Sequence, residues 1–126
     1  MPVYNEAGSM QPLYTEIARV TKTLPQYNFE CIFVDDGSSD GSANAVRALS
    51  AQGPAITLIS FSRNFGHQIA VTAGLDYADG DAVIIMDSDL QDPPPVIAEL
   101  LAEWEKGAHV VYATRRTRKD TWFKKT

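Results

Sequence analysis

Hydrophobic positions along the chain follow two spacings, one typical of helices and one typical of buried strands. Apolar residues recur at helical spacing from Leu13 to Leu24, and a second helical stripe runs from Val96 to Trp104. Short continuous apolar runs lie between the helical stretches, at 29–34, 56–61, 82–86 and 110–113. Such runs are typical of strands covered on both faces. The alternation predicts an α/β fold with a doubly wound, mostly parallel sheet and helices on both faces.

Capping and turn residues refine these boundaries. Ser9 suits the N-cap of the first helix, and Pro25 follows its end. A small-residue helix is expected over 67–78, while Asp92 and Pro93 suit the start of the helix that carries Val96. Residues 1–6 look like the exit of a strand whose body is absent. We therefore expect the first strand and the C-terminal part of the domain to be truncated.

Composition limits the class of protein. The 126 residues are 44% hydrophobic, which suits one domain with a sizeable core. Cys31 lies within an apolar run, so we expect a buried thiol in a reducing compartment. The sequence has no stretch of about 20 apolar residues and no signal peptide at its start. These features predict a soluble, cytoplasmic chain.

Acidic residues stand directly behind the apolar run 82–86. Asp87 and Asp89 follow it, with Gln91 two positions further on. Oxygen donors at this spacing suit a hard divalent cation, Mg²⁺ or Mn²⁺, whose shell is normally completed by water and substrate phosphates. The carboxyl ends of parallel strands form the ligand-binding edge of such sheets. The segment therefore predicts a metal and phosphate site.

The other polar positions divide between chemistry and structure. Asp36 stands at the end of a strand, where a carboxylate can accept hydrogen bonds from a ribose or a base. The turn 35–42 that contains it has the composition of an ordinary capped turn, so its remaining polar residues are assigned a structural role. His67 and His109 have no partner at ligand spacing and are assigned structural or surface roles as well.

Four segments carry a family resemblance. They occur in this order: Pro2-Val3-Tyr4-Asn5-Glu6, Val34-Asp35-Asp36-Gly37-Ser38-Ser39-Asp40-Gly41, Arg63-Asn64-Phe65-Gly66-His67-Gln68 and Asp87-Ser88-Asp89-Leu90-Gln91-Asp92-Pro93-Pro94. Together they resemble family 2 glycosyltransferases of the GT-A fold, in the branch that contains dolichyl-phosphate mannosyltransferase and the bacterial polyprenyl-phosphate glycosyltransferases.

The resemblance implies an inverting, metal-dependent transferase that moves a sugar from a UDP- or GDP-sugar to a polyprenyl phosphate, undecaprenyl or dolichyl, at the cytoplasmic face of a membrane. The implied metal ligands are Asp87, Asp89 and Gln91, with Mg²⁺ or Mn²⁺ as the cofactor. The implied nucleotide-sugar site comprises Pro2, Tyr4, Glu6, Val34, Asp36, Asp87, Ser88 and Arg115. The resemblance assigns catalytic roles to Asp89 and Arg115, and no nucleic acid partner is expected.

Charge divides the chain near residue 114. Residues 1–114 hold 5 Lys and Arg against 15 Asp and Glu, whereas residues 115–126 hold 6 against 1. We expect residues 1–114 to be the N-terminal part of a nucleotide-sugar-binding domain, and 115–126 to be a basic tail leading to a missing acceptor or membrane region. Trp122 and Phe123 beside two lysines suit either an interfacial helix or packing against that region.

Two alternatives stay open at this point. One is a nucleotide-sugar-binding fragment without catalysis. The other is a Mg²⁺-dependent phosphatase of the haloacid dehalogenase type, in which a buried strand also ends in Asp-x-Asp. That class has a Gly-Thr pair after the second aspartate, whereas Leu90 and Gln91 stand here. A phosphate acceptor is already anionic and has little need of a general base, so the absence of an obvious base is compatible with the transferase.

Overall fold

The computed structural model describes residues 1–49, 52–89, 94–108, 111–115 and 121–125. Within it the chain forms two compact units, Met1–Asp92 and Pro93–Thr126. None of the helices in the described part of the chain is long and apolar enough to cross a lipid bilayer.

The first unit is built on a parallel sheet. Its strands are β1 (Pro2–Val3), β2 (Glu30–Asp35) and β3 (Ala55–Ser60), in the order β1-β2-β3. The register pairs Val3 with Asp35 and Asp35 with Ser60, so the carboxyl ends of the three strands lie level. The loops that follow them therefore leave from one edge, as the sequence predicts.

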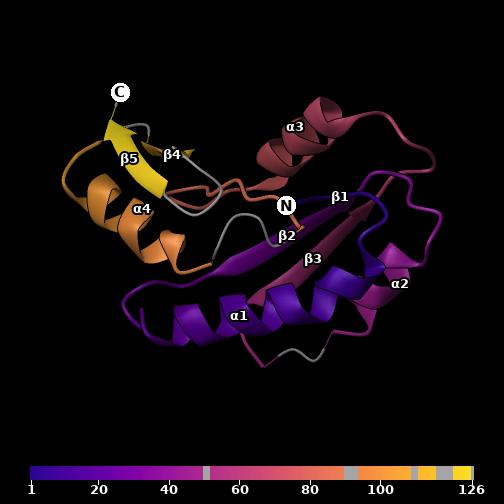
Figure 1. The fold of residues 1–126 in the computed structure, drawn as a ribbon, viewed down its shortest axis with the longest axis horizontal. Helices are drawn as coiled ribbons and strands as arrows, with labels where there is room; N and C mark the ends of the chain where they lie inside the picture. Colours follow the sequence, from indigo (N-terminus) through magenta and orange to yellow (C-terminus); the bar gives the residue numbers. More distant parts are fainter. Residues whose placement is uncertain (50–51, 90–93, 109–110, 116–120, 126) are drawn as a thin grey trace. The chain divides into compact units, whose positions relative to one another are not determined.

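Helices cover both faces of this sheet (Figure 1). A 3-10 helix, η1 (Ala7–Ser9), leads into α1 (Met10–Lys22), which lies with α2 (Ser42–Arg47) on one face, while α3 (His67–Tyr77) lies on the other. The predicted doubly wound α/β class is confirmed. Ser9 stands at the N-cap of α1 as expected, but its hydroxyl donates to Glu6 Oε2 at 3.0 Å instead of capping the helix backbone.

The side chains of β2 alternate between the two helical layers, as the pleat of a strand requires. Cys31 and Phe33 belong to the core on the α1 side, whereas a methyl group of Val34 lies 3.4 Å from the position that a β-carbon would take at Gly74 of α3. The predicted burial of Cys31 is confirmed. The main core cluster consists of Val3, Met10, Leu13, Tyr14, Ile17, Cys31, Phe33, Val46 and Leu49.

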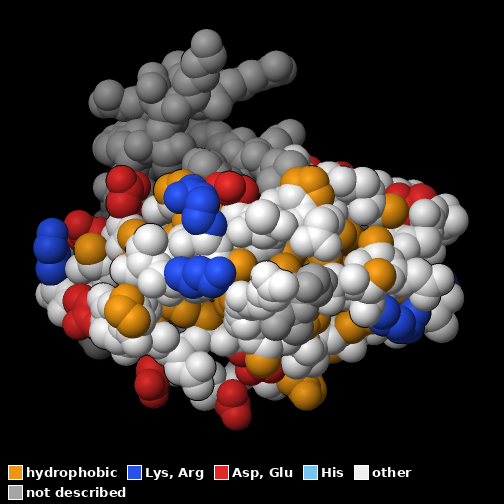
Figure 2. All heavy atoms as spheres, turned by 90° about the horizontal axis from the view of Figure 1, so that it is seen from below, with side chains coloured by type: hydrophobic (Ala, Val, Ile, Leu, Met, Phe, Trp, Pro, Cys, Tyr) orange, Lys and Arg blue, Asp and Glu red, His pale blue; other side chains and the backbone are white. Residues whose placement is uncertain are grey.

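The outer surface on the α1 side carries charge of both signs. Figure 2 shows that basic side chains are few there and stand among acidic, polar and apolar ones. Arg19 of α1, for example, pairs with Glu16 at 2.9 Å.

The strand expected over 82–86 is not formed. Residues 83–87 have no strand assignment, and Val83 and Ile85 are about half exposed while Met86 is buried. The alternation of a strand is thus retained, but the expected burial on both faces is wrong. Because β1 has only two residues, it offers this segment few backbone groups with which to form a ladder.

The second unit contains α4 (Val96–Glu105) and the strands β4 (Val111–Arg115) and β5 (Thr121–Lys125). The predicted helix and the predicted strand near 110–113 are both present, but β4 pairs antiparallel with β5 in a separate sheet. The alternative of an interfacial helix at Trp122 and Phe123 is wrong, because both residues lie in β5. Asp92, Pro93 and His109 lie outside the described residues.

Candidate functional site

Two of the loops at the carboxyl edge are joined by hydrogen bonds. The amide of Asn5 donates to Ser38 Oγ at 2.9 Å, and its side-chain oxygen accepts from the amide of Ser39 at 2.9 Å. The amide of Ala7 donates to Asp40 Oδ2 at 3.1 Å. The structural role assigned to the polar residues of 35–42 is thus confirmed, but what they hold is the loop after β1. Hydrogen bonds from Ser42 and Ala7 lower the pKa of Asp40.

Asp36 fixes the third loop. Its side chain is buried at 3% exposure, and its oxygens accept from the amide of Phe65 at 2.7 Å, the amide of Gly66 at 3.0 Å and Asn64 Nδ2 at 3.0 Å. The carboxylate expected beside a ribose or base therefore organises the turn in front of α3. A ribose contact by Asp36 stays a prediction.

The loops after β2 and β3 also meet backbone to backbone. Gly37 has a φ of 71°, and a β-carbon at this position would lie 2.2 Å from the carbonyl carbon of Arg63. The guanidinium of Arg63 lies 4.3 Å from the ring centre of Phe65, which packs edge-on against Phe61. Glycine at 37 is thus a condition for this close approach.

A buried hydrogen bond attaches the acidic segment to the sheet. Ser88 is 4% exposed, and its hydroxyl donates to the carbonyl oxygen of Pro2 at 2.8 Å. The side chain that was expected to touch the donor thus makes an internal contact. Because Ser88 stands between Asp87 and Asp89, this bond holds both carboxylates near the end of β1.

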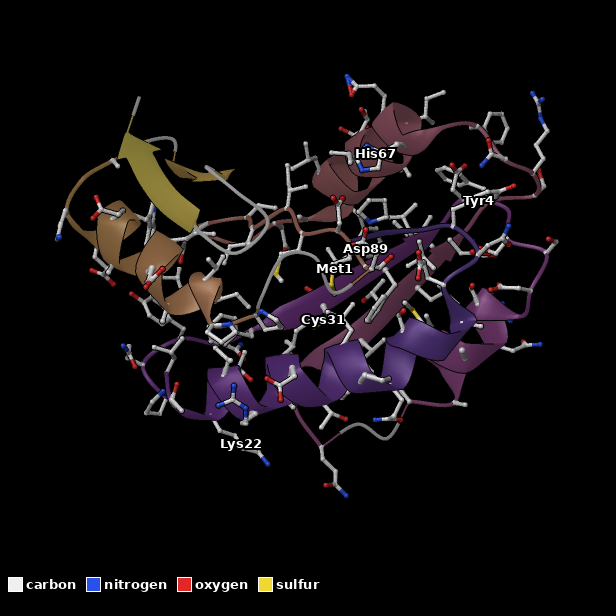
Figure 3. The ribbon with its side chains drawn as sticks, in the orientation of Figure 1. Met1, Tyr4, Lys22, Cys31, His67 and Asp89 are labelled. Carbon is white, nitrogen blue, oxygen red and sulfur yellow. The ribbon has the colours of Figure 1, made fainter. Side chains whose placement is uncertain are left out.

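Asp87 has a partner that the sequence did not indicate. His67, the first residue of α3, places Nε2 3.2 Å from Asp87 Oδ1. Figure 3 shows His67 above the segment that carries Asp89, on the α3 side of the sheet. The structural or surface role assigned to His67 overlooked this contact. Its position directly after the loop of a predicted parallel strand was the available signal, since such loops meet at one edge.

The donor chemistry of the acidic segment fits a hard cation. Asp87 and Asp89 are both partly exposed, and carboxylate oxygens are the ligands that Mg²⁺ and Mn²⁺ prefer. Over the residues described, no three histidine, cysteine or acidic side chains gather into a metal site. Two protein carboxylates suit a cation that takes its other ligands from phosphates and water. Gln91, the expected third ligand, lies outside the described residues.

The remaining candidate residues differ in their access to solvent. Tyr4 is 50% exposed, and Figure 3 shows it at the carboxyl edge. Glu6 is partly exposed and accepts the bond from Ser9. Pro2 and Val34 are buried, so contact with a ligand would have to use their backbone. Arg115 is the last residue of β4, in the second unit.

Comparison with known proteins gives one family. The model of glycosyl transferase family 2 matches residues 1–126. An uncharacterized glycosyltransferase, YkcC, of Bacillus subtilis (strain 168) is 48% identical over 126 residues, which are 99% of this chain and 39% of the relative. A prophage bactoprenol glucosyl transferase homolog of Escherichia coli (strain K12) is 42% identical over 118 residues, 94% of this chain and 38% of the relative.

A third relative adds a different sugar. The undecaprenyl-phosphate 4-deoxy-4-formamido-L-arabinose transferase of Proteus mirabilis (strain HI4320) is 44% identical over 127 aligned residues, which cover 100% of this chain and 39% of the relative. The chain thus spans about two fifths of the length of these relatives. With a family match over every residue and a parallel sheet whose loops carry the matching segments, the chain belongs to glycosyl transferase family 2.

Proposed function

We propose that this chain is the donor-binding part of an inverting glycosyltransferase that moves a sugar from a nucleotide diphosphate to a polyprenyl phosphate at the cytoplasmic face of a membrane. The observation that carries the proposal is the pair Asp87 and Asp89, held at the carboxyl edge by the bond from Ser88 to Pro2. Relatives named as bactoprenol and undecaprenyl-phosphate transferases support the choice of acceptor.

We assign the proposed roles of these residues by the solvent exposure of their side chains. Tyr4 offers the nucleotide a half-exposed aromatic face, whereas Asp36 holds the loop in front of α3 through the amides of Phe65 and Gly66. Pro2, Glu6, Val34 and Ser88 complete the proposed nucleotide-sugar site. We extend this donor-binding part to residue 114 and assign the basic tail, 115–126, to the acceptor side. There Arg115 would contact a donor or acceptor phosphate.

Asp87, Asp89 and Gln91 would hold the cation. Family 2 enzymes generally depend on a divalent metal. When bound, Mg²⁺ or Mn²⁺ supplies Lewis-acid stabilisation of the charge that develops on the departing nucleotide diphosphate. The attacking acceptor phosphate is already an anion and needs no general base. Direct attack on the face opposite the leaving group inverts the anomeric carbon.

Calorimetric titration tests donor binding. The 126-residue chain is titrated with UDP-glucose and GDP-mannose, with and without Mn²⁺. Asp89→Asn should weaken Mn²⁺-dependent binding at least about tenfold, because one oxygen ligand is replaced by a weaker one. The matched control is Asp76→Asn, an exposed carboxylate on α3, which should change nothing. Metal-dependent binding that survives Asp89→Asn would contradict the proposed cation site, and failure to bind either nucleotide would contradict donor binding.

A separate assay tests transfer. The protein is incubated with the donor that binds, Mn²⁺ and undecaprenyl phosphate in detergent, and the anomeric configuration of the lipid-linked sugar is read by NMR. An inverted product supports the proposal, and a retained configuration overturns the displacement mechanism. Donor binding without any transfer would favour the alternative of a non-catalytic binding fragment.

A further inference from the structure

His67 and Asp87 form a defined pair at the edge of the sheet. Nε2 of His67 lies 3.2 Å from Oδ1 of Asp87. Because a carboxylate oxygen only accepts, the hydrogen lies on Nε2 and the imidazole is the donor. The imidazole therefore restricts how the Asp87 carboxylate turns about its own bonds.

The pair contributes little to folding. The side chains of His67 and Asp87 are 66% and 50% exposed, and ion pairs or hydrogen bonds in such exposed positions are screened by water. Stability alone is therefore a weak reason for placing an imidazole against this carboxylate.

Each partner stands next to a buried anchor. The amide of Gly66, directly before His67, donates to Asp36 Oδ2 at 3.0 Å. The hydroxyl of Ser88, directly after Asp87, donates to Pro2 at 2.8 Å. The two anchors belong to neighbouring strands, because Asp36 follows β2 and Pro2 begins β1. Hydrogen bonds to the strand ends therefore hold the backbone beside each member of the exposed pair.

We infer that His67 is a positioning residue that orients Asp87 for the divalent cation. The inference rests on the proposed function, which makes Asp87 a metal ligand. Carboxylates that bind metals are themselves held by hydrogen bonds, and loss of such an outer partner typically costs about 10- to 100-fold in metal affinity. His67 supplies such a hydrogen bond from a different element, the first turn of α3.

The test measures Mn²⁺ affinity by electron paramagnetic resonance for four proteins: the unaltered chain, His67→Ala, His67→Gln and Gln68→Ala. His67→Ala should bind Mn²⁺ about 10- to 100-fold more weakly. His67→Gln places an amide donor near the position of Nε2 and should stay within about threefold of the unaltered chain. Gln68→Ala changes the adjacent exposed residue and should have no effect. The thermal unfolding midpoint should be the same for all four.

Each other outcome decides against the inference. Unchanged Mn²⁺ affinity in His67→Ala shows that the imidazole does not position Asp87. If His67→Gln and His67→Ala weaken Mn²⁺ binding equally, the hydrogen-bond donor at this position is not responsible for the affinity. A lowered unfolding midpoint in His67→Ala shows that His67 has a structural role. Asp89→Asn separates this inference from the proposed function: if only Asp89→Asn loses Mn²⁺, the inference alone fails. If the unaltered chain binds no Mn²⁺, both fail.

Discussion

The hydroxyl of Ser88 donates to the carbonyl oxygen of Pro2 at 2.8 Å across 86 residues of sequence. Among the described residues, the segment 83–87 forms no backbone ladder with a strand. The Ser88 side chain therefore supplies a connection to β1 that backbone hydrogen bonds would otherwise make. It attaches the acidic segment to β1 and so sets the backbone position of Asp87 and Asp89. A serine between two aspartates is thus a structural anchor for the proposed cation site.

Ser88→Ala is expected to destabilise the fold by about 1–3 kcal/mol, because the buried carbonyl of Pro2 loses its donor and gains no water. Urea unfolding followed by circular dichroism measures the change. Ser62→Ala, which alters an exposed hydroxyl in the loop after β3, should shift the free energy of unfolding by less than about 0.5 kcal/mol. Equal stability of the two variants would show that the bond to Pro2 contributes nothing.

Asp36→Asn is expected to destabilise the fold by about 2–3 kcal/mol, since both carboxylate oxygens accept bonds and an amide offers only one oxygen. Whichever way the amide turns, its NH₂ group faces a donor, either the amide of Phe65 or that of Gly66. The free energy of unfolding in urea gives the effect, with Asp76→Asn as the exposed control. A loss below about 0.5 kcal/mol would mean that the turn before α3 does not depend on this carboxylate.

Substitution of two glycines that have a positive φ distinguishes the cost of backbone strain from the cost of a steric collision. Gly41 has a φ of 87° with open space around it, so Gly41→Ala should cost about 1–2 kcal/mol from the backbone alone. Gly37→Ala adds a collision with the backbone of Arg63 and should cost about 3–4 kcal/mol. Thermal or urea unfolding of both variants measures the difference. If the two alanines cost the same, the loops after β2 and β3 separate easily.

The parallel sheet and its edge could be predicted because the apolar runs are local signals. The runs at 29–34 and 56–61 became β2 and β3, and the helical stripe that begins at Leu13 became α1, because each buries its apolar side chains against the others. Once the strands are parallel, the loops that follow them must meet. The proximity of the loops around Asn5 and Ser38 follows from this topology.

What the sequence could not indicate depends on contacts between distant residues. The run 82–86 has the composition of a buried strand, but a strand needs a partner, and β1 supplies only two residues. Parallel topology places His67 and Asp87, 20 positions apart, at the same edge of the sheet, but it does not determine which side chains meet there. Trp122 and Phe123 suit a helix or a strand by themselves, and pairing of β5 with β4 decided between them.

Cys31 provides a prediction on pH. Burial raises the pKa of its thiol to about 11 from an ordinary value of 9.0. In the unfolded chain the thiol ionises near its ordinary value, so alkaline pH favours unfolding. The contribution to stability is complete below about pH 9 and is lost as the pH rises through about 11, on the order of 2 kcal/mol in all.

Urea unfolding at pH 8, 9, 10 and 11 measures this loss, and Cys31→Ala is the matched variant. Burial also raises the pKa of Tyr14, and the nearby Cys31 adds to that rise. The difference in the free energy of unfolding between the two proteins therefore measures the thiol together with its electrostatic coupling to Tyr14. That difference should be constant up to about pH 9 and then move in favour of Cys31→Ala, because only the chain with the thiol gains an ionised unfolded state. A difference that stays flat to pH 11 would mean that the thiol ionises as easily in the fold as in the unfolded chain, and that the layer between β2 and α1 admits water.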